Sequence, residues 1–349
     1  MIVVYILILL LSFYLLAVIC DEFFVPALDV IIDRLKLNSD VAGATFMAVG
    51  SSAPELFTSL FAVLKPGEHA NIGAGTIVGS AIFNILVIIG ASALFKRAKL
   101  NWQPVVRDTL FYCLSIIMLL IAFWDGKIVL TEALYFAALY IGYVFSVVQW
   151  GKWFPYEDTD PIEIIEDEVH KSLLTRTARR FLSIFIPDAK KHPNKYILSF
   201  TMAIVLISAL SYSLVESAVA IGEVLHINPT IIALTVLAAG TSIPDLLSSM
   251  IVAKRGRGDM AVSNAVGSNI FDILFGLGAP WIVVLVFTDA KSIVVANENL
   301  ISSVILLFAT VVAVFVLLVA RNWVIGRKAG LLLIGSYVLY VMWNISQVV

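Results

Sequence analysis

Two short segments of the sequence carry the residue types from which a site for hard cations is built. G-S-S-A-P-E at 50–55 and G-T-S-I-P-D at 240–245 share glycine, hydroxyl, proline and carboxylate in one order. Each proline lacks an N–H, so the carbonyls of Gly50 and Gly240 lose their helical partners. Helix positions three and four apart lie on one face, which directs Ser52 and Glu55 the same way. The spacing predicts a carboxylate and a freed carbonyl side by side in each segment.

A second pair of segments adds hydroxyl and amide oxygens at four-residue spacing. The positions are Thr76, Ser80 and Asn84 in one segment and Asn264, Ser268 and Asp272 in the other. Carboxylates, hydroxyls, amides and carbonyls without His or Cys suit Ca²⁺, Na⁺ or K⁺ and not zinc or copper. Small residues in membrane helices also serve close packing, and Gly75 and Gly79 fit that alternative.

Composition places these segments in a membrane. Apolar residues make up 60% of the 349 residues, charged residues 14%, and the mean hydropathy is +0.98. The apolar runs are unbroken and about 20 residues long, which predicts spanning helices and not the alternating strands of a barrel. An ionised side chain at mid-bilayer costs at least ~2.5–3.5 kcal/mol. Glu55, Asp245 and Asp272 therefore predict a bound cation as their partner.

The sequence predicts ten helices in two halves of five. The expected segments are 2–32, 41–64, 71–94, 109–124, 128–150, 197–221, 229–253, 260–287, 300–320 and 329–347. The halves are 1–150 and 197–349, separated by the hydrophilic stretch 151–196. Its acidic cluster 157–168 has two interpretations, a site for a regulatory cation and a solvated linker, and the linker is preferred. No cofactor is expected. Nucleic acid is not expected as a partner either, because the net charge is only −2 and no long basic arm exists.

Basic residues predict the orientation. With the N-terminus outside, twenty of the 23 Lys and Arg, Arg107 among them, fall in cytoplasmic loops, and only Lys65, Lys127 and Lys291 fall outside. Both termini are then outside, and 151–196 is cytoplasmic. Glu22 and Glu216 are expected near outer, water-facing helix ends.

The two halves repeat each other. Residues 37–64 align without gaps on 227–254 at an offset of 190, and G-S-A-I-F-N at 79–84 matches G-S-N-I-F-D at 267–272. Five helices separate the copies, so the second copy enters the membrane inverted. Inverted repeats with interrupted helices are typical of secondary transporters, whose site lies between the repeats.

These segments resemble the alpha-repeat motifs of the cation/calcium antiporter superfamily, and most closely those of the potassium-dependent sodium/calcium exchangers. G-D-M-A-V-S-N-A-V-G-S-N-I-F-D-I-L at 258–274 is the most specific stretch. The resemblance implies exchange of Na⁺ for Ca²⁺ with K⁺ moving alongside Ca²⁺, in alpha motifs at 37–95 and 227–285. It also implies a multi-pass protein of the plasma membrane. The cation-coordinating positions that it implies are Ala48, Ser52, Glu55, Ser80, Asn84, Ala238, Ser242, Asp245, Ser268 and Asp272.

Several alternatives stay open or are excluded at this point. Potassium-independent Na⁺/Ca²⁺ exchange and H⁺/Ca²⁺ exchange would use the same oxygens. A cation channel also uses carbonyls and acidic rings, although inverted repeats favour alternating access. An intramembrane aspartyl protease is rejected, because G-R-G-D at 256–259 lies in a basic loop and no Tyr-Asp pair exists. The sequence therefore indicates a transporter and not an enzyme.

Overall fold

The computed structural model describes residues 2–35, 39–65, 70–95, 98–156, 173–189, 191–225, 229–254, 256–295 and 298–346, and these are almost entirely helical. The elements of the first part are α1 (Ile2–Ile19), η1 (Cys20–Phe24), α2 (Val25–Leu35), α3 (Ser39–Ala42), η2 (Gly43–Met47), α4 (Ala48–Ser51), α5 (Ala53–Leu64), α6 (Ala70–Phe83), η3 (Asn84–Ile88), α7 (Ile89–Phe95), β1 (Ala98–Lys99), α8 (Trp102–Trp124), β2 (Lys127–Ile128) and α9 (Leu130–Trp153). Those that follow are α10 (Leu173–Leu182), η4 (Pro193–Lys195), α11 (Tyr196–Leu225), α12 (Pro229–Ile232), η5 (Ala233–Leu237), α13 (Ala238–Thr241), α14 (Ile243–Lys254), α15 (Gly258–Phe271), η6 (Asp272–Leu277), α16 (Gly278–Phe287), β3 (Ile293–Val294), α17 (Glu298–Ala320), β4 (Val324–Ile325) and α18 (Arg327–Ser346).

The described residues contain fewer clear spans than the ten expected. Eight helices are long and apolar enough to cross a membrane, or nine if the bent pair Gly43–Ser51 and Ala53–Leu64 counts as one span. The prediction of ten is therefore supported for at most nine. α18 stands where the tenth segment, 329–347, was expected, but it begins with two basic residues and carries polar residues in its last turn.

The predicted interruptions are present, and they are accompanied by π-helical turns that the sequence did not predict. The helix breaks at Ser52 and at Ser242, with Pro54 and Pro244 near the starts of the helices that follow. The first break bends its helix by 50°. Within the described chain, η1, η2, η3, η5 and η6 are π-helical. Such turns are rare and are frequently found at functional sites.

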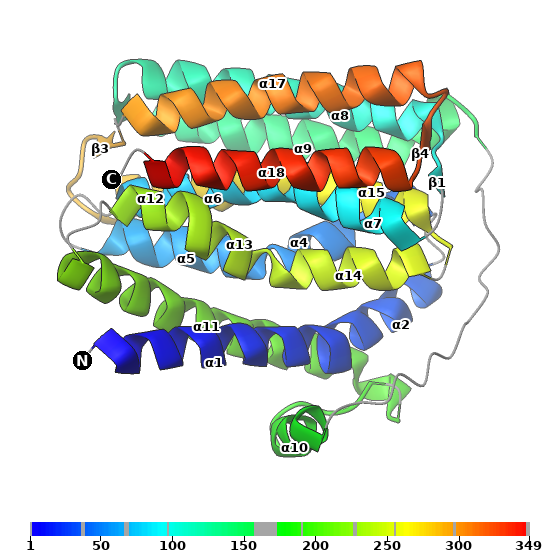
Figure 1. Ribbon diagram of the computed structural model, residues 1–349, viewed down its shortest axis with the longest axis horizontal. Coiled ribbons are helices and arrows are strands. Elements are labelled where there is room, and N and C mark those ends of the chain that lie inside the picture. The colour runs from blue at the N-terminus through cyan, green and yellow to red at the C-terminus, as the bar shows by residue number, and fades with distance from the viewer. Residues whose placement is uncertain are drawn as a thin grey trace.

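Two short strand pairs connect the two halves at opposite ends of the bundle. β1 pairs antiparallel with β4, and β2 pairs antiparallel with β3. Each pair thus takes one strand from each half. The first strand of each half pairs with the second strand of the other half, and we call this arrangement exchanged strand pairs. Figure 1 places β1 and β4 at the right end and β3 at the left, with the start of α1 and the end of α18 both at the left.

The core is divided into two clusters of buried side chains. One cluster fills the space among α6 to α9 and α15 to α18, and the other joins α1, α2 and α11 to the rest. In Figure 1, α1 and α11 form a layer along the lower side of the bundle, and they pack against each other. Phe24 and Phe13 fill the spaces beside Gly50 and Gly240, where an added Cβ would lie 2.1 Å and 1.8 Å from their rings.

Glycines allow the halves to approach each other reciprocally. An added Cβ at Gly79 of α6 would lie 2.4 Å from the Leu234 carbonyl oxygen of η5. One at Gly267 of α15 would lie 2.8 Å from Ala44 Cα of η2. Gly75 also faces η5, with Ala233 Cβ at 3.1 Å. The packing alternative is therefore correct for these glycines, and it brings the site-bearing elements of the two halves together.

We expect Gly79→Ala to destabilise the protein by roughly 1–3 kcal/mol, because the backbone it would clash with must shift. Gly142→Ala is the matched control, since nothing lies within 4 Å of a Cβ at that position in α9. Thermal unfolding of both variants in the same detergent measures the difference. Equal transition midpoints for the two variants would contradict the close packing of α6 against η5.

Three expectations about charged residues need correction or fall outside the described part. Arg107 is not a loop residue, because α8 begins seven residues earlier than predicted and buries Arg107 beside Asp108, Nε to Oδ1 2.7 Å. Glu22 is 4% exposed and pairs with Arg179 of the 151–196 stretch, Oε2 to Nε 3.0 Å, so it is not at a water-facing outer end. The Glu216 side chain, in contrast, is 43% exposed, and its Oε1 pairs with Lys65 Nζ at 2.9 Å. The acidic cluster 157–168 lies outside the described residues.

Candidate cation-binding site

The ten residues predicted to coordinate cations are all inaccessible to solvent. The side chains of Ser52, Glu55, Ser80, Asn84, Ser242, Asp245, Ser268 and Asp272 and the residues Ala48 and Ala238 each have 0% exposure. They come from the two helix breaks and from the helices α6 and α15, each of which continues into a π-helical turn at Asn84 or at Asp272. The interruptions thus lie where the two halves pack against each other.

The Glu55 carboxylate is held by the opposite half of the chain. The Ser242 hydroxyl donates to Glu55 Oε1 at 3.0 Å, and Thr241 lies close by. Oε2 is buried and has no hydrogen-bond partner within the described chain. A buried carboxylate oxygen without a partner costs more than a satisfied one. This oxygen is therefore a free ligand position.

Asp245 is held by both halves. Ser268 donates to its Oδ1 at 2.8 Å, and Asn84 donates through Nδ2 to its Oδ2 at 3.1 Å. Ser51 and Asn264 also lie beside this carboxylate. Since Ser242 binds Glu55 and Asn84 binds Asp245, each carboxylate is bound by a side chain of the other half.

Asn84 presents an oxygen because its amide nitrogen is already used. Nδ2 donates to Asp245 and also to Asn269 Oδ1 at 2.9 Å, while Oδ1 is buried without a partner among the described residues. Asn269 in turn donates through Nδ2 to the Ala81 carbonyl at 3.1 Å and to the Tyr112 hydroxyl at 2.8 Å. The chain Tyr112–Asn269–Asn84 therefore fixes which atom of Asn84 can face a cation.

Of the three buried carboxylates of the site, Asp272 has the fewest hydrogen bonds. Neither of its oxygens has a hydrogen-bond partner in the part of the chain that the structure describes. Ser52 lies beside it, and the charges of Glu55 and Asp245 act on it. Among the described residues, no Lys or Arg forms an ion pair with these three carboxylates, so no basic side chain there compensates their charge.

Three of the predicted ligands make hydrogen bonds within their own helices. The carbonyls of Ala48 and Ala238 accept the backbone N–H groups of Ser52 and Ser242 at 3.0 and 3.3 Å. Ser80 donates its hydroxyl to the Ile77 carbonyl at 2.9 Å. The carbonyls of Ala48 and Ala238 also accept the hydroxyls of Ser51 and Thr241, at 3.4 and 3.5 Å.

Several residues of the network were missed from the sequence. They are Ser51, Thr241 and Tyr112. Ser51 and Thr241 occupy matching positions at the offset of 190, so comparing hydroxyls between the repeats would have found them. Nothing in the sequence pointed to Tyr112, because α8 lies outside both repeated segments.

The geometry sets limits on what can bind. Among the described residues, no three His, Cys, Asp or Glu side chains converge tightly enough to hold one metal ion by themselves. Hydroxyl and amide oxygens must therefore complete any coordination shell. Six to eight oxygens at mixed distances are what Ca²⁺ takes, whereas Mg²⁺ demands a stricter octahedron. The arrangement fits exchangeable hard cations better than a structural metal.

We expect Tyr112→Phe to weaken cation binding about fivefold, because it removes one hydrogen bond worth about 1 kcal/mol from Asn269. Asn269 can then rotate, and Asn84 loses its fixed orientation. Tyr135→Phe on the exposed side of α9 is the control. Titration of the purified protein with Ca²⁺ measures both. An unchanged affinity in Tyr112→Phe would show that Asn84 is oriented without Tyr112.

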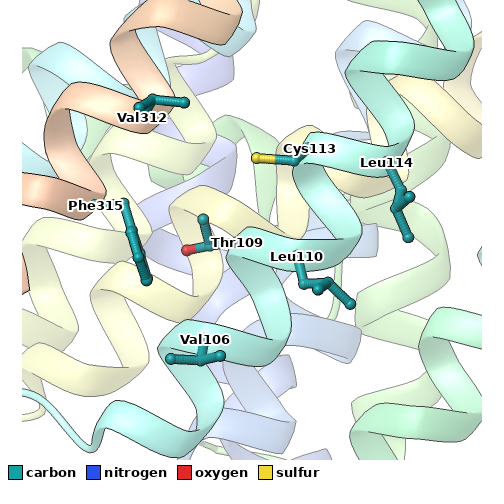
Figure 2. A pocket seen from close by; sticks show the side chains of 7 residues that line it. All are labelled: Val106, Thr109, Leu110, Cys113, Leu114, Val312 and Phe315. Atoms are coloured by element: carbon teal, nitrogen blue, oxygen red, sulfur yellow. The ribbon is translucent and has the colours of Figure 1, made fainter.

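A separate hollow of about 320 Å³ lies between α8 and α17. Figure 2 shows its lining side chains, which are Val106, Thr109, Leu110, Cys113, Leu114, Val312 and Phe315. Leu110, Leu114 and Val312 are exposed on the outer face of the bundle. This hollow is apolar and contains none of the carboxylates, so it does not belong to the cation site.

Comparison with known proteins places the chain among ion exchangers. The model of the sodium/calcium exchanger protein family matches residues 5–149 and 195–346. Sodium/potassium/calcium exchanger 2 of Homo sapiens is 30% identical over 95% of this chain and 76% of its own length. Sodium/potassium/calcium exchanger 5 of Homo sapiens is 31% identical, over 96% and 81%. A structure of the sodium-calcium exchanger NCX_Mj, soaked with 2.5 mM Na⁺ and 0.1 mM Ca²⁺, has a TM-score of 0.65 and 25% identity, and the match covers 98% of this chain and 99% of that one.

Proposed function

Because this chain belongs to the sodium/calcium exchanger protein family, we propose that it is a secondary antiporter that moves Ca²⁺ against Na⁺ across a membrane. The observation that carries the proposal is the pair Glu55 and Asp245, one from each half, each bound by a side chain of the other half. One Ca²⁺ neutralises two carboxylates, and so do two Na⁺. Either load therefore compensates the same buried charge, which is the basis of exchange.

We further propose that K⁺ moves together with Ca²⁺. The support is Asp272, whose two oxygens are buried without partners among the described residues. With Glu55 and Asp245 it makes three negative charges, and Ca²⁺ supplies only two positive ones. The relatives of similar sequence are named sodium/potassium/calcium exchangers. Protonation of one carboxylate would balance the charge without K⁺, and this distinguishes H⁺-dependent exchange from the K⁺-dependent reaction.

The architecture that we propose is ten spans in two inverted repeats of five. It is supported by the matching breaks at Ser52 and Ser242, by the matching π turns that start at Asn84 and Asp272, and by the exchanged strand pairs. Arg34 stacks on Tyr196 and Arg327 donates to the Leu94 carbonyl, so loops expected on the cytoplasmic side contact one another. The outward-facing termini and a plasma-membrane location belong to the same proposal, which requires no cofactor.

Transport follows if the site opens to one side at a time. The breaks give each half a short helix whose packing against the other half can change without breaking the rest of its hydrogen bonds. Moving one charge through 100 mV is worth about 2.3 kcal/mol. A sodium gradient and the membrane potential together can therefore drive Ca²⁺ uphill.

The test is Ca²⁺ uptake into proteoliposomes that are loaded with Na⁺, with and without external K⁺. We expect uptake that requires internal Na⁺ and rises with K⁺ at constant ionic strength. Replacing Na⁺ by a large organic cation is the control. Unchanged uptake after this replacement would refute Na⁺ exchange. Uptake driven by a pH gradient alone would favour the H⁺/Ca²⁺ alternative.

A further inference from the structure

A row of small and polar residues on α5 connects the Glu55 carboxylate to the end of the helix. Positions 55, 58, 62 and 65 follow one another at spacings of three and four residues, which places Glu55, Thr58, Ala62 and Lys65 on one face. Glu55, Thr58 and Ala62 each have 0% exposure. Beyond Glu55, this face therefore carries a hydroxyl and a methyl group, and no bulky side chain precedes Lys65 on it.

Two buried oxygens of this row have no hydrogen-bond partner within the described chain. They are Glu55 Oε2 and Thr58 Oγ1, which belong to successive turns of α5. A helical threonine commonly donates to the carbonyl three or four residues back, as Thr76 of α6 does to Ile72 at 2.8 Å. A buried hydroxyl without such a bond costs free energy. Thr58 therefore offers an oxygen one turn beyond the free oxygen of Glu55.

α11 packs against α5, and their contacts continue to the ends of both helices. The Phe61 ring meets Tyr212 edge-on with centroids 5.2 Å apart, and Lys65 Nζ pairs with Glu216 Oε1 at 2.9 Å. Tyr212 and Glu216 are four residues apart and share one face of α11. Since Tyr212 is 50% exposed and Thr58 is fully buried, the aromatic pair lies on the lipid side of the row.

The ion pair at the end of this row is open to water. The Lys65 and Glu216 side chains are 27% and 43% exposed. An exposed ion pair shifts an equilibrium by at most about fivefold, so another cation can replace the ammonium group. In Figure 1, α11 ends at the left, where α1 begins and α18 ends. The pair therefore lies at that end of the bundle, beyond Thr58 as seen from the cation site.

We propose that cations reach Glu55 along the seam between α5 and α11, and that Glu216 is the first residue to bind them. Thr58 supplies an oxygen between Glu216 and Glu55. Lys65 occupies the Glu216 carboxylate when no cation is bound there, and an arriving cation displaces it. Because Ca²⁺ carries two charges and Na⁺ one, this competition favours Ca²⁺ at the entrance. The cargo of the route rests on the proposed function, whereas the access of a cation from water to Thr58 does not.

Labelling of Thr58→Cys in nanodiscs tests the route. The probe is the cationic thiol reagent methanethiosulfonate-ethyltrimethylammonium, and mass spectrometry measures the modified fraction at position 58. Ser115→Cys is the matched control, because Ser115 of α8 is equally buried. We expect labelling at least about tenfold faster at position 58, since access there requires loss of an exposed ion pair and access to position 115 requires local unfolding. The anionic sulfonate analogue should react more slowly at position 58.

Removal of the Lys65 charge tests the competition for Glu216. Lys65→Met keeps a long side chain, and we expect it to accelerate labelling of Thr58→Cys by about two- to fivefold. The acceleration should vanish in the Glu216→Gln background, because a double-variant cycle isolates the interaction between the two side chains. Lys127→Met is the control. It removes an exposed charge from β2, which pairs with β3 at the same end of the bundle, and should have no effect.

Labelling of position 58 as slow as that of position 115 would overturn the route. An acceleration by Lys65→Met that persists in the Glu216→Gln background would overturn the competition. In proteoliposomes, Glu216→Gln should raise the external Ca²⁺ concentration for half-maximal uptake about two- to fivefold, and Glu223→Gln should not. Equal values for the two variants would overturn the role of Glu216. An absence of Na⁺-dependent uptake would refute the proposed function but leave the labelling result intact.

Discussion

Glu55→Gln is expected to lower the affinity for Ca²⁺ at least about 100-fold, because two unit charges 4 Å apart interact by roughly 4 kcal/mol even at an effective dielectric constant of 20. The substitution keeps the volume and one acceptor oxygen for the Ser242 hydroxyl, which donates to Glu55 at 3.0 Å. It removes the charge and replaces the other carboxylate oxygen by an NH2 donor. Na⁺ affinity should fall less, since the Coulomb energy scales with the charge of the ion. Asp245→Asn should behave in the same way.

Ca²⁺ and Na⁺ titrations of uptake into proteoliposomes measure these effects. Glu223→Gln is the matched control, because Glu223 is an exposed carboxylate at the end of α11. It should leave both affinities unchanged. If Glu55→Gln transports Ca²⁺ with the affinity of the unmodified chain, the site lies elsewhere. Equal losses for Ca²⁺ and Na⁺ would show that the substitution damages the fold and not the charge balance.

Asp272→Asn is expected to abolish the response to K⁺ while Na⁺/Ca²⁺ exchange continues. An uncompensated buried charge costs several kcal/mol, so removal of K⁺ should slow the unmodified chain at least about tenfold. The variant holds two carboxylates for one Ca²⁺ and needs no further cation. Asn84, its counterpart in the first half, is already neutral. In the variant, the matching positions 84 and 272 of the two repeats would both carry neutral amides.

Uptake with K⁺ replaced by an organic cation at fixed ionic strength provides the measurement. Asp289→Asn is the control, because Asp289 is an exposed aspartate of the same half. Its response to K⁺ should match that of the unmodified chain. Uptake by the unmodified chain that is indifferent to K⁺ would refute the K⁺ assignment. A variant that stays sensitive to K⁺ would place the monovalent ion on other residues.

The sequence predicted the features that repeat. The offset of 190 identified the paired breaks, because a proline and a carboxylate at matching positions have the same effect on the backbone in both copies. It also predicted that Glu55, Asp245 and Asp272 would be buried, since apolar runs surround them. Burial of all three is confirmed. Their coordination of cations stays a prediction.

The remaining features depend on contacts between segments far apart in the chain. Tyr112 joins the network only because α8 packs beside α15, and no local pattern records that contact. Arg107 was taken for a loop residue because charge usually ends a span, but inside the bundle it pairs with Asp108, which also accepts the Tyr143 hydroxyl. The π turns have no clear signal in the composition, so the sequence did not predict them. Because a π turn inserts a residue into the helix, the side chains after Asn84 face other directions than a regular α-helix would give them.

The exchanged strand pairs have a consequence for how the chain is made. β1 must wait for β4, which leaves the ribosome more than 200 residues later. At about 5–20 residues per second, that delay is roughly 10–45 s. During this time Glu55 has neither Ser242 nor a completed site around it, so the first half enters the membrane with a carboxylate that the second half must later cover. Biosynthesis therefore passes through an intermediate that is vulnerable to quality control, and a chain that stops after α9 should be degraded and not accumulate as a half-transporter.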